Sequence, residues 1–94
     1  MHTIKYKKVA DKNHSSAIIT ISVDTSKSSA DIAKTVFGIP GVKRVFEVSG
    51  AHDITAIISA PDNQGINGIV DRIRGIFGIV KTDTMIVLND LSRK

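Results

Sequence analysis

The sequence predicts an α+β domain with the ferredoxin-like order strand, helix, strand, strand, helix, strand (βαββαβ). Three observations support this prediction. A stretch with helical periodicity is followed by a strand-like stretch twice in the chain. The two halves also share an echo, because residues 37–43 (FGIPGVK) are followed 40 residues later by residues 77–81 (FGIVK). Finally, isoleucine and valine dominate the apolar residues, and these β-branched side chains suit a pleated sheet.

The first half begins with a strand over residues 17–24, in which apolar side chains on one face alternate with Ile, Thr and Ser on the other. A helix follows the expected N-cap Ser28, and Asp31 in its first turn favours the helix dipole and the free amides. Its buried stripe is expected to comprise Ile32, Ala33, Val36 and Phe37. We expect Gly38 to end the helix by permitting a positive φ, and Pro40 with Gly41 to prevent its continuation.

The second half contains two more strands and a second helix. Residues 42–48 and 54–60 are strands joined by the short turn 49–53, which makes them antiparallel neighbours. Asp62 is the expected N-cap of the second helix, whose glycines make it depend on packing more than on propensity. Its apolar residues recur with helical spacing at Ile66, Ile69, Val70, Ile73 and Ile76. Residues 80–88 form the last strand.

The order of these elements places both helices on one face of a four-stranded antiparallel sheet, because each crossover is right-handed. In a monomer the other face should be polar. Instead, Ile18 lies opposite Ile19 and Ile57 opposite Ile58, so both faces carry apolar residues. An exposed apolar face of that extent indicates an interface. We therefore expect a homodimer in which the open sheet faces pack together, a dimeric α+β barrel.

Composition excludes several functions. The chain has 94 residues and no cysteine, so it forms one domain without disulfides or thiolate metal sites. His2, His14 and His52 lack metal-ligand spacing, and no phosphate-binding or dinucleotide-binding motif occurs, so we expect no metal, cofactor or catalytic residue. No apolar run approaches the ~20 residues that span a bilayer, and a signal peptide is not evident, so we expect a cytoplasmic protein without membrane contact.

Basic residues concentrate near the two ends of the chain, which carries a net charge of +4. We interpret these residues as solubilising, with no DNA binding or only weak, non-specific binding. The chain is expected to divide into an N-terminal tail or linker strand (1–16), the domain proper (17–89) and a polar C-terminal tail (90–94).

Three runs of sequence resemble the effector-binding domain of Lrp/AsnC-type transcription regulators, also called the RAM domain. They are AIITISV (17–23), IPGVKRVFEVSGAHD (39–53) and TDTMIVL (82–88). The resemblance covers about residues 17–89. It implies a prokaryotic, non-enzymatic domain that binds free amino acids, dimerises through its sheet and assembles into higher oligomers, commonly an octameric ring.

The resemblance also implies a ligand site in the clefts between dimers. The residues that match its contacts are Ser49, Gly50, Ala51, His52 and Asp53 in the turn, Asn63 at the start of the second helix, and Thr84, Met85 and Ile86 in the last strand. The chemistry is consistent with a zwitterion. Gly50 lets backbone amides approach a carboxylate, and Asp53 can accept from an ammonium group. His52 replaces a residue that is often aromatic, which leaves room for a polar or acidic ligand side chain.

Regulators of this type carry a helix-turn-helix ahead of the domain, and residues 1–16 are too few to contain one. We therefore expect a stand-alone member that acts on transcription through partners such as full-length regulators, with residues 5–9 matching the linker strand.

An enzyme of the dimeric α+β barrel type, such as a small monooxygenase or isomerase, is the alternative function. Such an enzyme needs polar groups between the sheet and the helices, where the sequence places Ile, Val and Ala. An ACT-type module is a third reading, but the glycine it uses after the first strand does not occur in residues 24–29.

Overall fold

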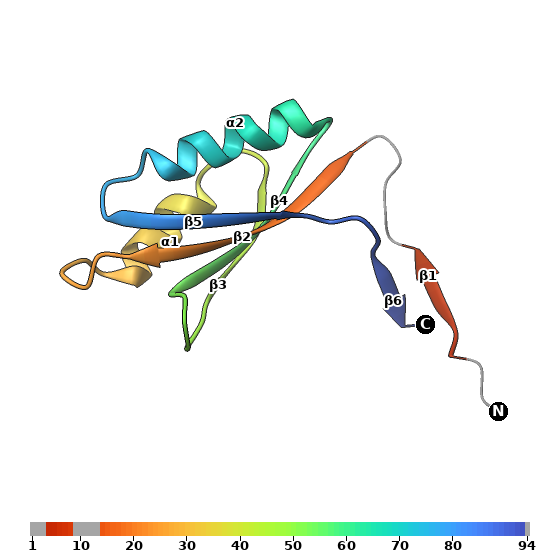
Figure 1. The fold of residues 1–94 in the computed structure, drawn as a ribbon, viewed down its shortest axis with the longest axis horizontal. Coiled ribbons are helices and arrows are strands. Elements are labelled where there is room, and N and C mark those ends of the chain that lie inside the picture. The colour runs from red at the N-terminus through yellow and green to blue at the C-terminus, as the bar shows by residue number, and fades with distance from the viewer. Residues whose placement is uncertain (1–3, 9–13, 94) are drawn as a thin grey trace.

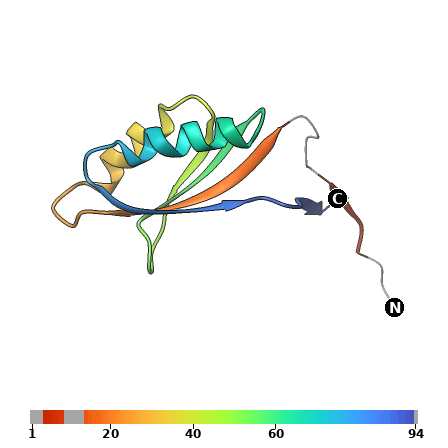
Figure 2. The ribbon, with the colours of Figure 1, turned by 45° about the horizontal axis from the view of Figure 1, so that its top comes forward.

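The main body of the chain is the expected βαββαβ unit, as a computed structural model that describes residues 4–8 and 14–93 shows (Figure 1). Its elements are β2 (Ser15–Val23), α1 (Ser29–Phe37), β3 (Val42–Glu47), β4 (Ile54–Ala60), α2 (Asn63–Arg74) and β5 (Ile79–Ile86). The four strands form one antiparallel sheet in the order β3-β4-β2-β5. Both helices cover the same face of this sheet (Figure 2). The predicted ferredoxin-like fold is confirmed.

Both predicted N-caps are confirmed by their hydrogen bonds. The Ser28 hydroxyl accepts from the Asp31 amide at 3.2 Å, and Asp62 Oδ1 accepts from the Gly65 amide at 2.8 Å. Each bond satisfies one of the amides that a helix start leaves without a partner inside the helix. These local signals therefore fix where the two helices begin.

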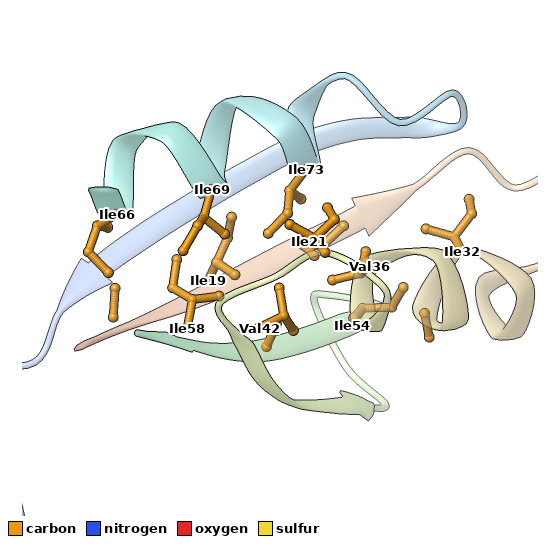
Figure 3. Packing of buried hydrophobic residues seen from close by; sticks show 14 of the residues in the cluster. Ile19, Ile21, Ile32, Val36, Val42, Ile54, Ile58, Ile66, Ile69 and Ile73 are labelled. Atoms are coloured by element: carbon orange, nitrogen blue, oxygen red, sulfur yellow. The ribbon is translucent and has the colours of Figure 1, made fainter. Parts of the chain in front are cut away.

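The core lies between the sheet and the two helices (Figure 3). Isoleucine dominates it, and the largest fully buried side chains are Ile19, Ile21, Ile54, Ile58, Ile66, Ile73 and Val36. Every buried side chain in the described part of the chain is Ile, Val or Ala.

The predicted stripe of α1 is wrong at Phe37. This side chain is 59% exposed, whereas Ile32, Ala33 and Val36 are buried. The physical reason is the position of α1 over β3, which is an edge strand. Phe37 is the last residue of the helix, and no strand from the described part of the chain lies beyond β3 to cover it.

The internal repeat has a different register from the one the sequence suggested. Both helices have a right-handed C-cap glycine, Gly38 (φ −71°) and Gly75 (φ −77°). Both then enter the next strand through a glycine with positive φ, Gly41 (+95°) and Gly78 (+102°). The equivalent glycines are 37 residues apart, so the repeat is GIPGV in the first half and GIFGI in the second.

The 40-residue echo is therefore wrong as a structural equivalence, and Phe77 corresponds to Pro40. The expected positive φ at Gly38 is also wrong, because positive φ occurs at Gly41 instead. The two turns share the same tertiary contact, since each positive-φ glycine carbonyl accepts an amide from a neighbouring strand or its end. The Gly41 carbonyl accepts from Ser59 N and the Gly78 carbonyl from Asp24 N, both at 2.8 Å.

The open face of the sheet is partly apolar. Cross-strand partners place Arg44, Ile57, Ile18 and Met85 in one row across the four strands. Ile18 and Ile57 are half-buried, and Met85 is 50% exposed. Apolar residues therefore lie on both faces of the sheet, as predicted, and the homodimer remains a prediction.

A second, two-stranded sheet stands apart from the body. Strand β1 (Tyr6–Lys8) pairs antiparallel with β6 (Leu91–Arg93), and we call this pair the ribbon. Both views show it projecting from the end of the body where β2 begins (Figures 1 and 2). The radius of gyration, 14.8 Å, exceeds the roughly 12 Å expected for a compact domain of this length.

The two strands of the ribbon lie in the two segments that we expected as tails. Strand β1 falls within residues 5–9, which we expected as a linker strand, although Val9 lies outside the described residues. The segment 90–94, expected as a polar tail, contains β6.

Neither of the two helices in the described part of the chain has the length and apolar character that a membrane-spanning helix needs.

Candidate functional site

The turn between β3 and β4 exposes its backbone. Its base is closed by the Val48 amide, which donates to the Asp53 carbonyl at 3.0 Å. Gly50 has a φ of +115°, and a Cβ placed on it would meet no atom within 4 Å. The predicted site residues of this turn divide by exposure: Ser49, Gly50 and Ala51 are exposed, and His52 and Asp53 are half-buried. A ligand can therefore approach Gly50 without steric obstruction from the same chain.

Asp53 anchors the turn to the neighbouring strand. Its Oδ2 accepts from the Val23 amide at 2.8 Å, and its own amide donates to the Ile21 carbonyl at 3.0 Å. Both bonds reach the end of β2, so Asp53 sets the position of the turn. The sequence offered no signal for this role beyond the ability of aspartate to cap turns.

The connection after β2 is ordered at the same end of the sheet. Asp24 Oδ1 accepts from the Ser26 amide and from the Ser26 hydroxyl, both at 2.9 Å. The backbone hydrogen bond from Ser26, followed by its side-chain bond, lowers the pKa of Asp24 below its usual value. Asp24 therefore fixes the start of the connection between β2 and α1.

The remaining predicted contacts lie on α2 and β5. Asn63 is exposed at the start of α2. Thr84 and Ile86 pair with Ile19 and Ala17, two buried positions, whereas Met85 pairs with Ile18 on the open face. Met85 therefore points to the opposite side of the sheet from Thr84 and Ile86. One small ligand cannot contact all three from a single direction.

The two groups of predicted contacts are at opposite ends of β4. The turn precedes Ile54 at one end of this strand, and Asn63 follows Ala60 at the other. Seven strand residues separate them, a span of roughly 20 Å at about 3.4 Å per step. Figure 1 shows the β3–β4 turn and the start of α2 pointing away from each other. One chain therefore does not bring these residues together, although two copies placed end to end could.

Two surface hollows contain residues that the sequence analysis did not select. One, of about 520 Å³, lies between α1 and β3, where Phe37, Phe46 and Lys43 contribute to its walls. The other, of about 360 Å³, is lined by Arg74 and by the start of β5, including Lys81 and Thr82. Arg74 and Lys81 could hold a carboxylate. They gave no signal in the sequence, because the turn over residues 75–78 must fold before the end of α2 and the start of β5 share one hollow.

A family model for the Lrp/AsnC ligand binding domain matches residues 16–94. The chain belongs to the Lrp/AsnC ligand-binding domain family. It is thus a domain of the type found in Lrp/AsnC transcription regulators, and the resemblance read from the sequence is confirmed.

This Lrp/AsnC domain is similar to parts of two kinds of curated protein. The chain is 34% identical over 86 residues to the HTH-type transcriptional regulator LysM of Saccharolobus solfataricus, covering 92% of this chain and 58% of the regulator. It is also 32% identical over 75 residues to a homocitrate synthase of Sulfurisphaera tokodaii, covering 80% of this chain and 16% of the synthase. The chain thus spans only part of each relative.

Solved structures share the fold. A protein of Thermus thermophilus superposes with a TM-score of 0.77 at 20% identity, covering 84% of this chain and 99% of that one. A transcriptional regulator of Neisseria meningitidis, solved as a complex with L-Met, superposes with a TM-score of 0.71 at 22% identity, covering 79% of this chain and 49% of the regulator.

Proposed function

We propose that this Lrp/AsnC domain is a non-enzymatic sensor that binds a free amino acid between copies of the chain. The observation that carries the proposal is the family match over residues 16–94, because ligand binding defines that family. The L-Met complex of the similarly folded Neisseria regulator supports an amino acid as the ligand class. The open backbone at Gly50 supports the β3–β4 turn as a contact for the carboxylate.

The separation of the contacts supports a site made by more than one copy. The turn of one protomer would supply Gly50, and its partner would supply Asn63 or the exposed end of β5. Such a site forms only when dimers, joined through their open sheet faces, assemble into a higher oligomer such as an octameric ring. Ligand binding and assembly are then linked, so each strengthens the other.

The composition of the core supports a binding role over the enzyme alternative. The buried space between sheet and helices is filled by Ile, Val and Ala in the described residues. These side chains offer no general acid, base or nucleophile. We therefore propose that any chemistry lies with a partner and that this domain only reports the ligand.

Calorimetric titration with each of the twenty standard amino acids tests the sensor proposal. We expect at least one to bind with a dissociation constant at or below the millimolar range. Gly50→Ala should weaken that binding about tenfold, roughly 1.4 kcal/mol, because it adds a methyl group and strains the turn. Gly68→Ala, on the exposed side of α2 with no atom within 4 Å of its Cβ, is the matched control and should bind as the parent does. If no amino acid binds at millimolar concentration, the proposal is wrong.

We further propose that the bound ligand acts on transcription through a full-length regulator that co-assembles with this chain. The LysM relative supports a regulator partner, and the homocitrate synthase relatives support an enzyme partner as the second candidate. Native mass spectrometry of this chain with a purified Lrp/AsnC regulator, and separately with a homocitrate synthase, both from its own organism, distinguishes them. Mixed oligomers with the regulator alone support the first candidate. Mixed oligomers with neither protein contradict both.

A further inference from the structure

The net charge of the chain is confined to its two terminal segments. Residues 14–87 contain seven Lys and Arg and seven Asp and Glu, so the body is neutral. Residues 1–13 and 88–94 contain six Lys and Arg and two Asp, which accounts for the whole formal charge of +4. In the sequence these segments are far apart, whereas the fold joins them through the ribbon.

The register of the ribbon sets no acidic residue opposite a basic one. It pairs Tyr6 with Arg93, Lys7 with Ser92 and Lys8 with Leu91. No cross-strand carboxylate neutralises a basic residue in this register, and an isolated two-stranded ribbon is only marginally stable in water. A bound polyanion would neutralise these basic residues and give the ribbon a surface to pack on.

The shape of the ribbon favours duplex DNA among polyanions. The ribbon is two strands wide and projects clear of the body (Figures 1 and 2). The major groove of B-DNA, about 12 Å wide, admits a two-stranded β-ribbon, whereas the deep, narrow major groove of A-form RNA does not. Exposed Tyr6 and Arg93 are a cross-strand pair that could contact the groove wall.

We propose that the ribbon binds the phosphate backbone of duplex DNA, without regard to sequence. This activity is separate from the amino-acid site. It uses four basic residues that the sequence places in the two ribbon strands and at their flank, Lys5, Lys7, Lys8 and Arg93. Four phosphate contacts predict a slope of about −3.6 for the logarithm of the association constant against the logarithm of salt concentration. Affinity should therefore fall about 100-fold between 50 and 200 mM salt.

Fluorescence anisotropy with a labelled 20-base-pair DNA duplex tests the proposal, using two variants of equal net charge. The ribbon variant combines Lys5→Gln, Lys7→Gln, Lys8→Gln and Arg93→Gln. The body variant combines Lys34→Gln, Lys43→Gln, Arg72→Gln and Arg74→Gln, four exposed positions of the globular part. Circular dichroism and the melting temperature verify that each variant is folded.

We expect the parent and the body variant to bind with similar affinity and with slopes between about −3 and −4. The ribbon variant should lose binding at least 30-fold at 50 mM salt, and a duplex of scrambled sequence should bind the parent equally well. Equal losses in both variants would show that net charge alone is responsible and would overturn the proposal. Absence of binding at low salt would overturn it too, as would tighter binding to an RNA duplex of the same sequence or to phosphatidylserine–phosphatidylcholine vesicles.

Discussion

Gly41→Ala should lower the free energy of unfolding by about 3 kcal/mol. An alanine at φ +95° is strained by about 1–2 kcal/mol, and its Cβ would overlap Ile69 Cδ1 and lie 3.0 Å from the Ser59 carbonyl oxygen. Backbone cannot move aside as a flexible side chain can, so steric strain adds to the conformational cost. Urea denaturation of the variant and the parent at equal protein concentration measures the difference.

Two other glycines provide matched controls for this substitution. Gly68→Ala should raise stability by about 1 kcal/mol, because it removes a glycine from a helix where nothing lies within 4 Å of the new Cβ. Gly50 has a positive φ but open space around its Cβ position. Gly50→Ala should therefore lower the free energy of unfolding only through backbone strain, by about 1–2 kcal/mol. If Gly41→Ala costs no more than Gly50→Ala, the close packing of α2 on this turn is not the cause.

Ile57→Lys should convert the proposed dimer into a monomer. Ile57 lies in the row of the open sheet face that also holds Ile18 and Arg44, its cross-strand neighbours. In a face-to-face dimer each protomer would bury one ammonium group beside Arg44, which carries the same charge, at about 3 kcal/mol or more per charge. Two charges would raise the dimer dissociation constant about 10⁴-fold. Light scattering should give twice 10.1 kDa, or a multiple of it, for the parent and 10.1 kDa for the variant.

The control replaces an apolar residue away from this face. Phe77 is 82% exposed in the turn after α2, where Lys27 Nζ lies 4.5 Å from its ring centroid. Phe77→Glu should keep the oligomeric state of the parent, and Ile57→Val should keep it as well. A monomeric parent at micromolar concentration would contradict the dimer, and dissociation caused equally by Phe77→Glu would contradict the choice of face.

The candidate site shows where inference from the sequence reached its limit. The exposed turn around Gly50 lies where the residues predicted, because a short polar segment between two strands must lie at the edge of a sheet. The hydrogen bond from the Val23 amide to Asp53 Oδ2 joins residues 30 apart in the chain and could not be inferred from spacing. The distance between the turn and Asn63 depends on the direction of β4, which also required the fold.

The sequence by itself determined the elements of the main body, from β2 to β5, and their order. Alternating and helical periodicities and the caps Ser28 and Asp62 involve residues that are close together in the sequence. They can therefore be recognised without the tertiary structure. Only the tertiary structure decided the 37-residue register of the repeat, the exposure of Phe37 and the pairing of two basic ends into one ribbon. Each of these depends on contacts between segments distant in the chain, and the free energy of such contacts is not encoded in any local pattern.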